Sequence, residues 1–147
     1  MPTGQTGPPT PRTATPPAPA RQPTRAKKRI LVIEDHADTA RALAVRLEAA
    51  QYEVTTAADV LLGLNLLVRD QPDLVLLDVL LPSGNGFALV ELARKLSPQL
   101  PPILVMTSIK QPELRERARS LGLAGFFEKP LDTQALLATI HNSLHEV

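Results

Sequence analysis

Residues 74–78, Leu-Val-Leu-Leu-Asp, decide the fold class of this 147-residue chain. Four consecutive apolar residues without alternation are typical of a strand that is buried on both faces, as the strands of a parallel sheet are. Pro72 separates this run from the helical pattern before it, and a loop is expected after it over 82–86. The stretch therefore predicts a buried strand with a carboxylate, Asp78, at its carboxyl end.

Four more short apolar runs share this character, and they lie at 30–33, 52–57, 103–106 and 124–127. Between and after the strands, apolar residues recur at intervals of three and four, which predicts helices. The helices are expected at 38–47, 59–70, 89–96, 112–121 and 132–144, with Asp38, Asp59 and Asp132 as N-caps. Alternating strands and helices predict one α/β domain, in which helices cover both faces of an open, doubly wound parallel sheet.

Residues 1–29 differ sharply from the rest of the chain. They hold eight of the 15 prolines, six of the 16 basic residues, none of the 15 acidic residues and no Leu, Ile, Val or Phe. Too little apolar surface is present to offset the entropy of ordering this segment, so we expect a disordered basic Pro/Thr-rich tail at 1–29 and a single domain at 30–147. The tail carries +6 and the domain −5. Contact with nucleic acid or an anionic membrane through the basic cluster at 25–29 stays open, as does binding of the Pro-rich part to an SH3-like groove.

The composition excludes several classes of protein. With no cysteine, the chain has no disulfide framework, no thiolate metal site and no cysteine nucleophile. Its apolar runs are far shorter than the ~20 residues that cross a bilayer, and residues 1–29 lack the apolar core of a secretory signal. We therefore expect a cytoplasmic protein.

Charged and hydroxyl side chains follow the predicted strands at their carboxyl ends, where open α/β sheets bind ligands. The strands deliver in turn Glu34 and Asp35, Asp78, Thr107 and Lys129. Three converging carboxylates repel one another, and oxygen ligands without a His or Cys requirement favour Mg²⁺ as the cation between them. A hydroxyl and an ammonium group bind anions. Together these side chains predict a phosphoryl site.

No familiar phosphate-binding or hydrolase motif supplies the nucleophile for such a site. The chain has no Gly-x-Gly-x-x-Gly, no Gly-rich loop that ends in Lys-Ser/Thr and no Gly-x-Ser-x-Gly. His36, His141 and His145 are expected to be ordinary surface or edge residues. A carboxylate nucleophile that forms an aspartyl phosphate remains.

Four stretches resemble the receiver domain of the two-component response regulators. They are Ile-Leu-Val-Ile-Glu-Asp at 30–35, Pro-Asp-Leu-Val-Leu-Leu-Asp at 72–78 with Leu81, Pro82 and Gly86 following, Val-Met-Thr-Ser at 105–108, and Gly-Phe-Phe-Glu-Lys-Pro at 125–130. All four occur in order, each at a strand end, and the resemblance covers about four-fifths of the chain. It implies a flavodoxin-like (βα)5 fold with a five-stranded parallel sheet in the order 2-1-3-4-5.

The resemblance also implies a role for each residue at the strand ends. Asp78 would be the phosphoacceptor and would take the phosphoryl group from a sensor histidine kinase or a phosphotransfer protein. Asp35, Asp78 and the backbone carbonyl of Leu80 would bind Mg²⁺, and Glu34 would act through water. The phosphoryl oxygens would be contacted by Thr107 and Lys129.

For signalling, the resemblance implies that Thr107 and Phe126 form a switch. The output face would combine the helix at 112–121, the strand at 124–127 and the helix at 132–145, and it would meet a downstream protein target or form a homodimer. Such a protein is a phosphoacceptor signalling domain that promotes its own phosphotransfer and dephosphorylation, and not an enzyme with a separate substrate.

Three other functions fit the sequence less well. A docking module of the same fold could signal without phosphorylation, but it would have no need of Asp78 or Lys129. A haloacid-dehalogenase-like phosphohydrolase requires a second acid two residues after its nucleophile, where this chain has Leu80. A transcription factor needs a DNA-binding domain, and none is expected because the sequence ends at Val147. The sequence thus predicts a stand-alone receiver.

Overall fold

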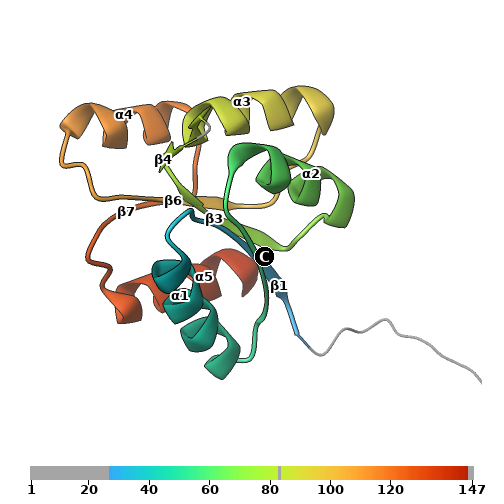
Figure 1. The fold of residues 1–147 in the computed structure, drawn as a ribbon, viewed down its shortest axis with the longest axis vertical. Coiled ribbons are helices and arrows are strands. Elements are labelled where there is room, and N and C mark those ends of the chain that lie inside the picture. The colour runs from blue at the N-terminus through green and yellow to red at the C-terminus, as the bar shows by residue number, and fades with distance from the viewer. Residues whose placement is uncertain (1–26, 83, 146–147) are drawn as a thin grey trace, which may run out of the picture.

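The computed structural model describes residues 27–82 and 84–145, and the predictions about residues 1–26 lie outside this part of the chain. A central sheet separates two layers of helices (Figure 1). Three helices, α2 (Val60–Asp70), α3 (Gly86–Leu96) and α4 (Pro112–Ser120), cover one face. The other face is covered by α1 (Ala37–Ala49) and α5 (Thr133–His145). This three-layer arrangement confirms the predicted α/β class.

The sheet is parallel throughout, with five strands in the order β2-β1-β3-β6-β7. Their bounds are β1 Arg29–Ile33, β2 Glu53–Ala57, β3 Leu74–Asp78, β6 Ile103–Thr107 and β7 Gly125–Glu128. The predicted order 2-1-3-4-5 is confirmed, because β4 (Leu80–Leu81) and β5 (Gly84–Asn85) form a separate antiparallel pair. Strand order reverses beside β1 and β3, and open α/β sheets bind ligands at such a switch point.

Two of the three predicted N-cap residues are confirmed, and the third is wrong. Asp59 Oδ1 accepts a hydrogen bond from Leu62 N at 2.9 Å, and Asp132 Oδ1 accepts one from Ala135 N at 3.1 Å. Helix α1, however, has His36 at its N-cap, and Asp38 lies inside the first turn. An acid is favoured by the helix dipole in either position, so the sequence pattern alone does not separate them.

The segment expected as a loop at 82–86 is more ordered than predicted, because it contains β5 and the start of α3. Asn85 caps α3 by accepting a hydrogen bond from Phe87 N at 2.7 Å. A Cβ on Gly86 would lie 2.6 Å from the carbonyl oxygen of Asp78. The absence of a side chain at Gly86 therefore lets α3 begin directly against the end of β3.

The start of the domain also differs slightly from the prediction. Arg29, expected in the tail, is the first residue of β1. Its backbone N–H donates to Asp73 Oδ2 at 2.7 Å, and its guanidinium donates to the carbonyl oxygen of Gln71 at 2.7 Å. These contacts hold the amino end of β1 against the connection between α2 and β3.

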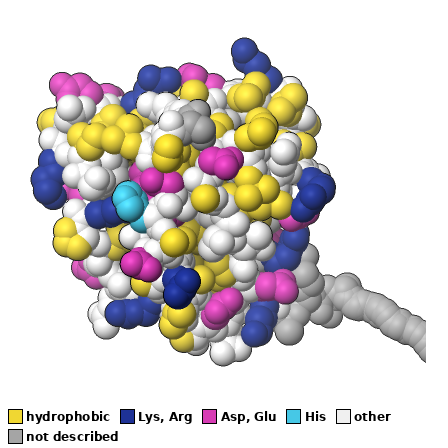
Figure 2. All heavy atoms as spheres, in the orientation of Figure 1, with side chains coloured by type: hydrophobic (Ala, Val, Ile, Leu, Met, Phe, Trp, Pro, Cys, Tyr) yellow, Lys and Arg dark blue, Asp and Glu magenta, His cyan; other side chains and the backbone are white. Residues whose placement is uncertain are grey.

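The core is apolar on both faces of the sheet, and every residue of β3 and β6 is buried. Exposed apolar surface gathers instead on one helical layer, over α2 and α3 (Figure 2). The large exposed side chains there are Leu61, Leu62, Leu92 and Leu96. Within 27–82 and 84–145, none of the helices has the length and apolar character needed to span a membrane.

Candidate functional site

Buried polar side chains collect at the carboxyl edge of the sheet. Glu34 follows β1, Asp78 ends β3 and Thr107 ends β6. They are 2%, 5% and 0% exposed, and they are the buried polar or charged residues of the described part of the chain. Because burial of unpaired polar groups is costly, their presence at one edge indicates a site and not a structural accident.

Lys129 links two of these buried acids. It follows β7, and its ammonium nitrogen lies 2.6 Å from Glu34 Oε1 and 3.0 Å from Asp78 Oδ2. The backbone N–H of Lys129 donates to the carbonyl oxygen of Thr107 at 2.8 Å, which fixes the lysine at the strand edge. The peptide bond between Lys129 and Pro130 is cis. One cation thus lies between two carboxylates and offsets part of their repulsion.

The second oxygen of Glu34 is held by His36. Both the backbone N–H and Nδ1 of His36 contact Glu34 Oε2, at 3.1 Å and 3.2 Å. The His36 side chain is 71% exposed, as expected for a surface residue, yet its contact with Glu34 was not predicted. Its position at the N-cap of α1, two residues after Glu34, is the sequence signal that could have indicated it.

The pKa values of these groups follow from burial and pairing. Burial raises the pKa of Asp78, and the charge of Glu34 adds to this, so that the hydrogen bonds from Lys129 and Leu80 do not restore the ordinary value. Burial also acts to raise the pKa of Glu34, but hydrogen bonds from Lys129 and His36 outweigh it and lower that pKa. Burial alone would lower the pKa of Lys129, and the two carboxylates raise it.

Asp78 is held on both of its oxygens. Oδ2 contacts Lys129, and Oδ1 accepts a hydrogen bond from the backbone N–H of Leu80 at 3.0 Å. The side chain of Leu80 itself is 46% exposed. The turn after β3 therefore fixes the direction of the carboxylate and places the Leu80 peptide beside it.

Asp35 supplies the observation that tests the site for a metal ion. Its Oδ1 is buried and has no hydrogen-bond partner among the described residues, although His36 Nδ1 lies 3.6 Å away. Ligand atoms of Glu34, Asp35 and His36 lie within 4.8 Å of one another. A carboxylate oxygen left without a partner beside other acids fits a hard cation such as Mg²⁺. Asp35, Asp78 and the carbonyl of Leu80 would hold it.

Both carboxylate oxygens of Glu34 contact protein groups, Lys129 and His36. The role through water on Mg²⁺ that the resemblance implies stays a prediction. A glutamate has a longer side chain than an aspartate, and here it reaches the ammonium group directly. Glu34 thus belongs to the site but acts on Lys129 in this arrangement.

Thr107 and Phe126 occupy neighbouring strands. The hydroxyl of Thr107 accepts a hydrogen bond from the backbone N–H of Ile109 at 3.0 Å. Phe126 is half-buried in β7, and the guanidinium carbon of Arg115 lies 4.6 Å from the centre of its ring. The structure therefore places Thr107 at the site edge and the Phe126 ring beside α4.

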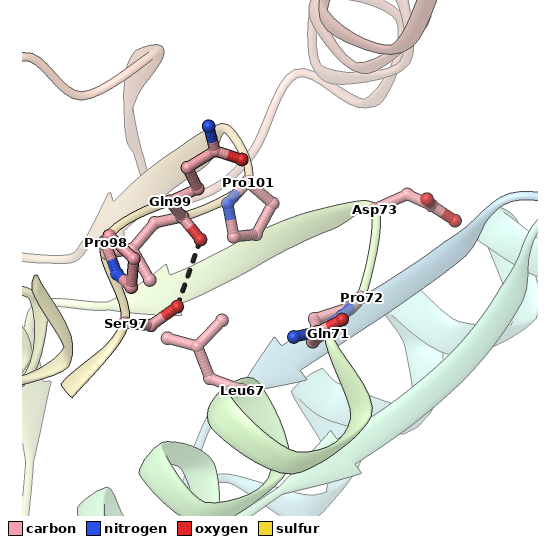
Figure 3. A pocket seen from close by; sticks show the side chains of 9 residues that line it. Leu67, Gln71, Pro72, Asp73, Ser97, Pro98, Gln99 and Pro101 are labelled. Atoms are coloured by element: carbon pink, nitrogen blue, oxygen red, sulfur yellow. Dashed lines mark hydrogen bonds between the residues drawn. The ribbon is translucent and has the colours of Figure 1, made fainter.

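Two hollows help to define the surroundings. A cavity of about 570 Å³ lies at the opposite, amino-terminal edge of the sheet, where the connections after α2 and α3 meet (Figure 3). Its lining carries Asp73 but none of the buried acids, so it is separate from the site. A second hollow of about 440 Å³ lies beside Lys129, between α1 and the connection from β7 to α5. Of the side chains gathered at the carboxyl edge of the sheet, Lys129 lines this hollow.

Comparison with known proteins agrees with the geometry. The family model of the response regulator receiver domain matches residues 30–141. Among solved structures, a CheY-like receiver domain protein from Methanospirillum hungatei has a TM-score of 0.76 at 30% identity and covers 82% of this chain and 96% of that one. The non-phosphorylated HemR receiver domain of Leptospira biflexa has a TM-score of 0.75 at 35% identity, with 82% and 97% covered.

Curated relatives are longer than this chain. The probable transcriptional regulator ycf27 of Porphyridium aerugineum is 34% identical over 121 residues, which are 82% of this chain and 50% of the relative. The DNA-binding dual master transcriptional regulator RpaA of Synechocystis is 32% identical over 113 residues, 76% of this chain and 47% of the relative. The chain spans about half the length of these relatives. The name of the Synechocystis relative includes DNA binding, which conflicts with the expected absence of a DNA-binding domain. We therefore do not propose a stand-alone role.

Proposed function

Because the chain belongs to the family of response regulator receiver domains, we propose that it accepts a phosphoryl group on Asp78 in the presence of Mg²⁺. The donor is a sensor histidine kinase or a phosphotransfer protein. The observation that carries the proposal is the shared contact of Lys129 with Asp78 and Glu34, beside an Asp35 oxygen that has no hydrogen-bond partner. A nucleophile, a phosphate-binding cation and a metal ligand meet at one edge of the sheet.

In the proposed reaction, a carboxylate oxygen of Asp78 forms a bond to the donor's phosphorus while the phosphorus–nitrogen bond to the donor histidine breaks. The electron pair of that bond stays on the imidazole, which takes up a proton. Asp35, Asp78 and the Leu80 carbonyl would hold Mg²⁺, which would supply positive charge against the phosphoryl oxygens. Lys129 leaves Asp78 and pairs with the new phosphate. Such transfers depend chiefly on positioning and on charge neutralisation.

The signal would leave through a different part of the surface. In this proposal Thr107 turns its hydroxyl from Ile109 toward the phosphate, and the Phe126 ring follows into the space that Thr107 vacates. The face formed by α4, β7 and α5 then changes, and a downstream protein or a second copy of the chain reads it. Two discrete packings of one element amplify a small local shift in this way.

The surface beside Lys129 is where we expect the donor to bind. The hollow beside Lys129 is bounded by Asp38, Leu43 and Arg46 on α1 and by Pro130 and Leu131 on the other side. A donor protein that binds over this hollow would contact Lys129, whose ammonium nitrogen lies 3.0 Å from Asp78 Oδ2. The domain would promote its own phosphotransfer and dephosphorylation, and it would act in the cytoplasm. The alternative of docking without phosphorylation gains no support from the site, because every reacting group is present.

Intact-mass measurement after incubation with acetyl phosphate and Mg²⁺ tests the proposal. The wild type should gain the mass of one phosphoryl group, and EDTA should abolish the gain. Asp78→Asn should gain nothing, whereas Asp73→Asn, at the opposite edge of the sheet, should behave as the wild type. A full gain of mass by Asp78→Asn would contradict the assignment.

A further inference from the structure

The ring of Phe126 is covered by a positive charge. The guanidinium carbon of Arg115, on α4, lies 4.6 Å from the ring centre. A cation within about 6 Å of an aromatic face is attracted by the ring quadrupole. Phe126 is half-buried and Arg115 is exposed, so the contact lies at the surface between α4 and β7.

Arg115 differs from the other arginines of its helix in what it contacts. Arg117 pairs with Glu91 at 3.0 Å, and Arg119 reaches Glu116 at 4.0 Å. Within the described residues, no carboxylate lies within ion-pair distance of Arg115. The aromatic ring is therefore the principal contact that orients its guanidinium group.

We infer that Arg115 is a positioning residue, which holds the Phe126 ring in its present orientation and so opposes the phosphorylated arrangement. The inference rests on the proposed function, in which the ring turns inward after phosphorylation. A turn of the ring out of its present position takes it away from the guanidinium carbon, which lies 4.6 Å from its centre. The contact is thus present in one state and lost in the other, and it shifts the equilibrium between them.

The expected size of this shift follows from the strength of such contacts. An exposed cation–π contact biases a two-state equilibrium by a factor of about two to five. The apparent affinity of a ligand for the inward state is proportional to the fraction of protein in that state. Removal of the contact therefore raises this affinity by the same factor when the present arrangement predominates without ligand, and by less otherwise. Beryllofluoride with Mg²⁺ imitates a bound phosphoryl group and can serve as that ligand.

The test is a beryllofluoride titration in the presence of Mg²⁺. It is followed by ¹⁹F NMR of full-length protein that carries 4-fluorophenylalanine at its three phenylalanines. Arg115→Ala should bind about two to five times more tightly than the wild type. Without ligand, its Phe126 resonance should already lie closer to the bound position. Arg115→Lys keeps a cation over the ring and should restore most of the wild-type affinity.

Arg117 provides the matched control. Its guanidinium carbon lies 5.5 Å from the ring centre of Phe87, a core residue that is 2% exposed and is no part of the switch. Arg117→Ala removes a cation–π contact from the same helix, so it should change unfolding stability without changing beryllofluoride affinity. If the role of Arg115 were purely structural, Arg115→Ala would give the same result as Arg117→Ala.

The outcomes separate this inference from the function on which it rests. Wild-type protein that binds beryllofluoride, together with an Arg115→Ala variant of unchanged affinity and unchanged Phe126 resonance, would overturn the inference alone. Failure of the wild type to bind, or equal binding by Asp78→Asn, would overturn the proposed function and the inference with it.

Discussion

The single ammonium group of Lys129 contacts two buried acids, and its contribution to the stability of the fold can be measured. The side chains of Glu34 and Asp78 are 0% and 7% exposed, so neither carboxylate can be solvated in place of its contact with the lysine. Removal of the one cation of this cluster leaves two buried carboxylates uncompensated, which is strongly destabilising. Lys129 therefore supports the fold as well as the chemistry.

The variant Lys129→Met should lower the free energy of unfolding at pH 7 by about 3 kcal/mol. The pKa of Lys129 is raised in the fold, so its stabilising effect is complete below its ordinary value of 10.5 and is lost as pH rises through the higher folded value. Urea unfolding at pH 7 measures the loss. Lys110→Met, whose side chain is 69% exposed and 3.7 Å from Glu128, should change stability by less than about 0.5 kcal/mol. Equal effects of the two variants would contradict this account.

Asp78 shows the opposite balance, because its function conflicts with stability. Its pKa is raised by burial and by Glu34, so the fold disfavours the ionised form. The penalty is complete above the raised folded pKa, and it vanishes as pH falls below the ordinary value of 3.8. A neutral side chain of the same shape avoids it.

Asp78→Asn should accordingly be more stable than the wild type at pH 7, by about 1 kcal/mol, as is common when a strained functional group is replaced. The difference should shrink as pH is lowered toward 4, because the wild-type carboxyl group then becomes neutral. Urea unfolding at both pH values measures it. A less stable Asp78→Asn at pH 7 would show that the ionised carboxylate stabilises the fold.

Helix α3 begins directly beside the carboxyl end of β3, the strand that ends in Asp78. Gly86 N donates a hydrogen bond to the carbonyl oxygen of Val79 at 2.7 Å, directly after the end of β3. A Cβ at Gly86 would approach the Asp78 carbonyl oxygen to 2.6 Å and the Val79 Cα to 3.2 Å. These are backbone atoms at the carboxyl end of β3, of Asp78 and of the residue that follows it, and they cannot move independently of the strand.

Gly86→Ala should therefore cost about 2 kcal/mol of stability, because overpacking against backbone forces α3 away from β3. It should also slow phosphorylation by acetyl phosphate, since the turn that orients Asp78 moves with the helix. Gly84→Ala is the matched control. Its Cβ would lie 3.2 Å from Cγ2 of Val60, a side-chain atom and not a backbone atom, so a smaller loss is expected. Chemical denaturation and the rate of mass gain measure both variants.

The elements that sequence patterns predicted well are those with long apolar runs. β3 and β6 are buried throughout, and their continuous apolar sequence predicts this directly. The short pair β4 and β5 was missed, because strands of two residues carry no periodicity. The N-cap of α1 was misplaced from His36 to Asp38, since an acid in the first turn and an acid at the cap look alike in a sequence.

For the molecule as a whole, the sheet topology made the site predictable in outline. Parallel strands bring their carboxyl ends to one edge, so Glu34, Asp78, Thr107 and Lys129 could be placed together before any side-chain position was known. The partners of each side chain could not be predicted in this way. Glu34 contacts Lys129, which is 95 residues away in the sequence, and no spacing encodes that pair.

We propose that Asp78 alone accepts the phosphoryl group, and chemical trapping of the acyl phosphate is the measurement that identifies the accepting residue. Borohydride reduces an aspartyl phosphate to homoserine, and peptide mass spectrometry then locates the altered residue. After treatment with acetyl phosphate and Mg²⁺, we expect homoserine at position 78 and at no other aspartate, and none when EDTA is present. Homoserine at Asp35, 2-amino-5-hydroxypentanoic acid at Glu34, or a gain of phosphoryl mass without homoserine at position 78 would show that another group accepts the phosphoryl group.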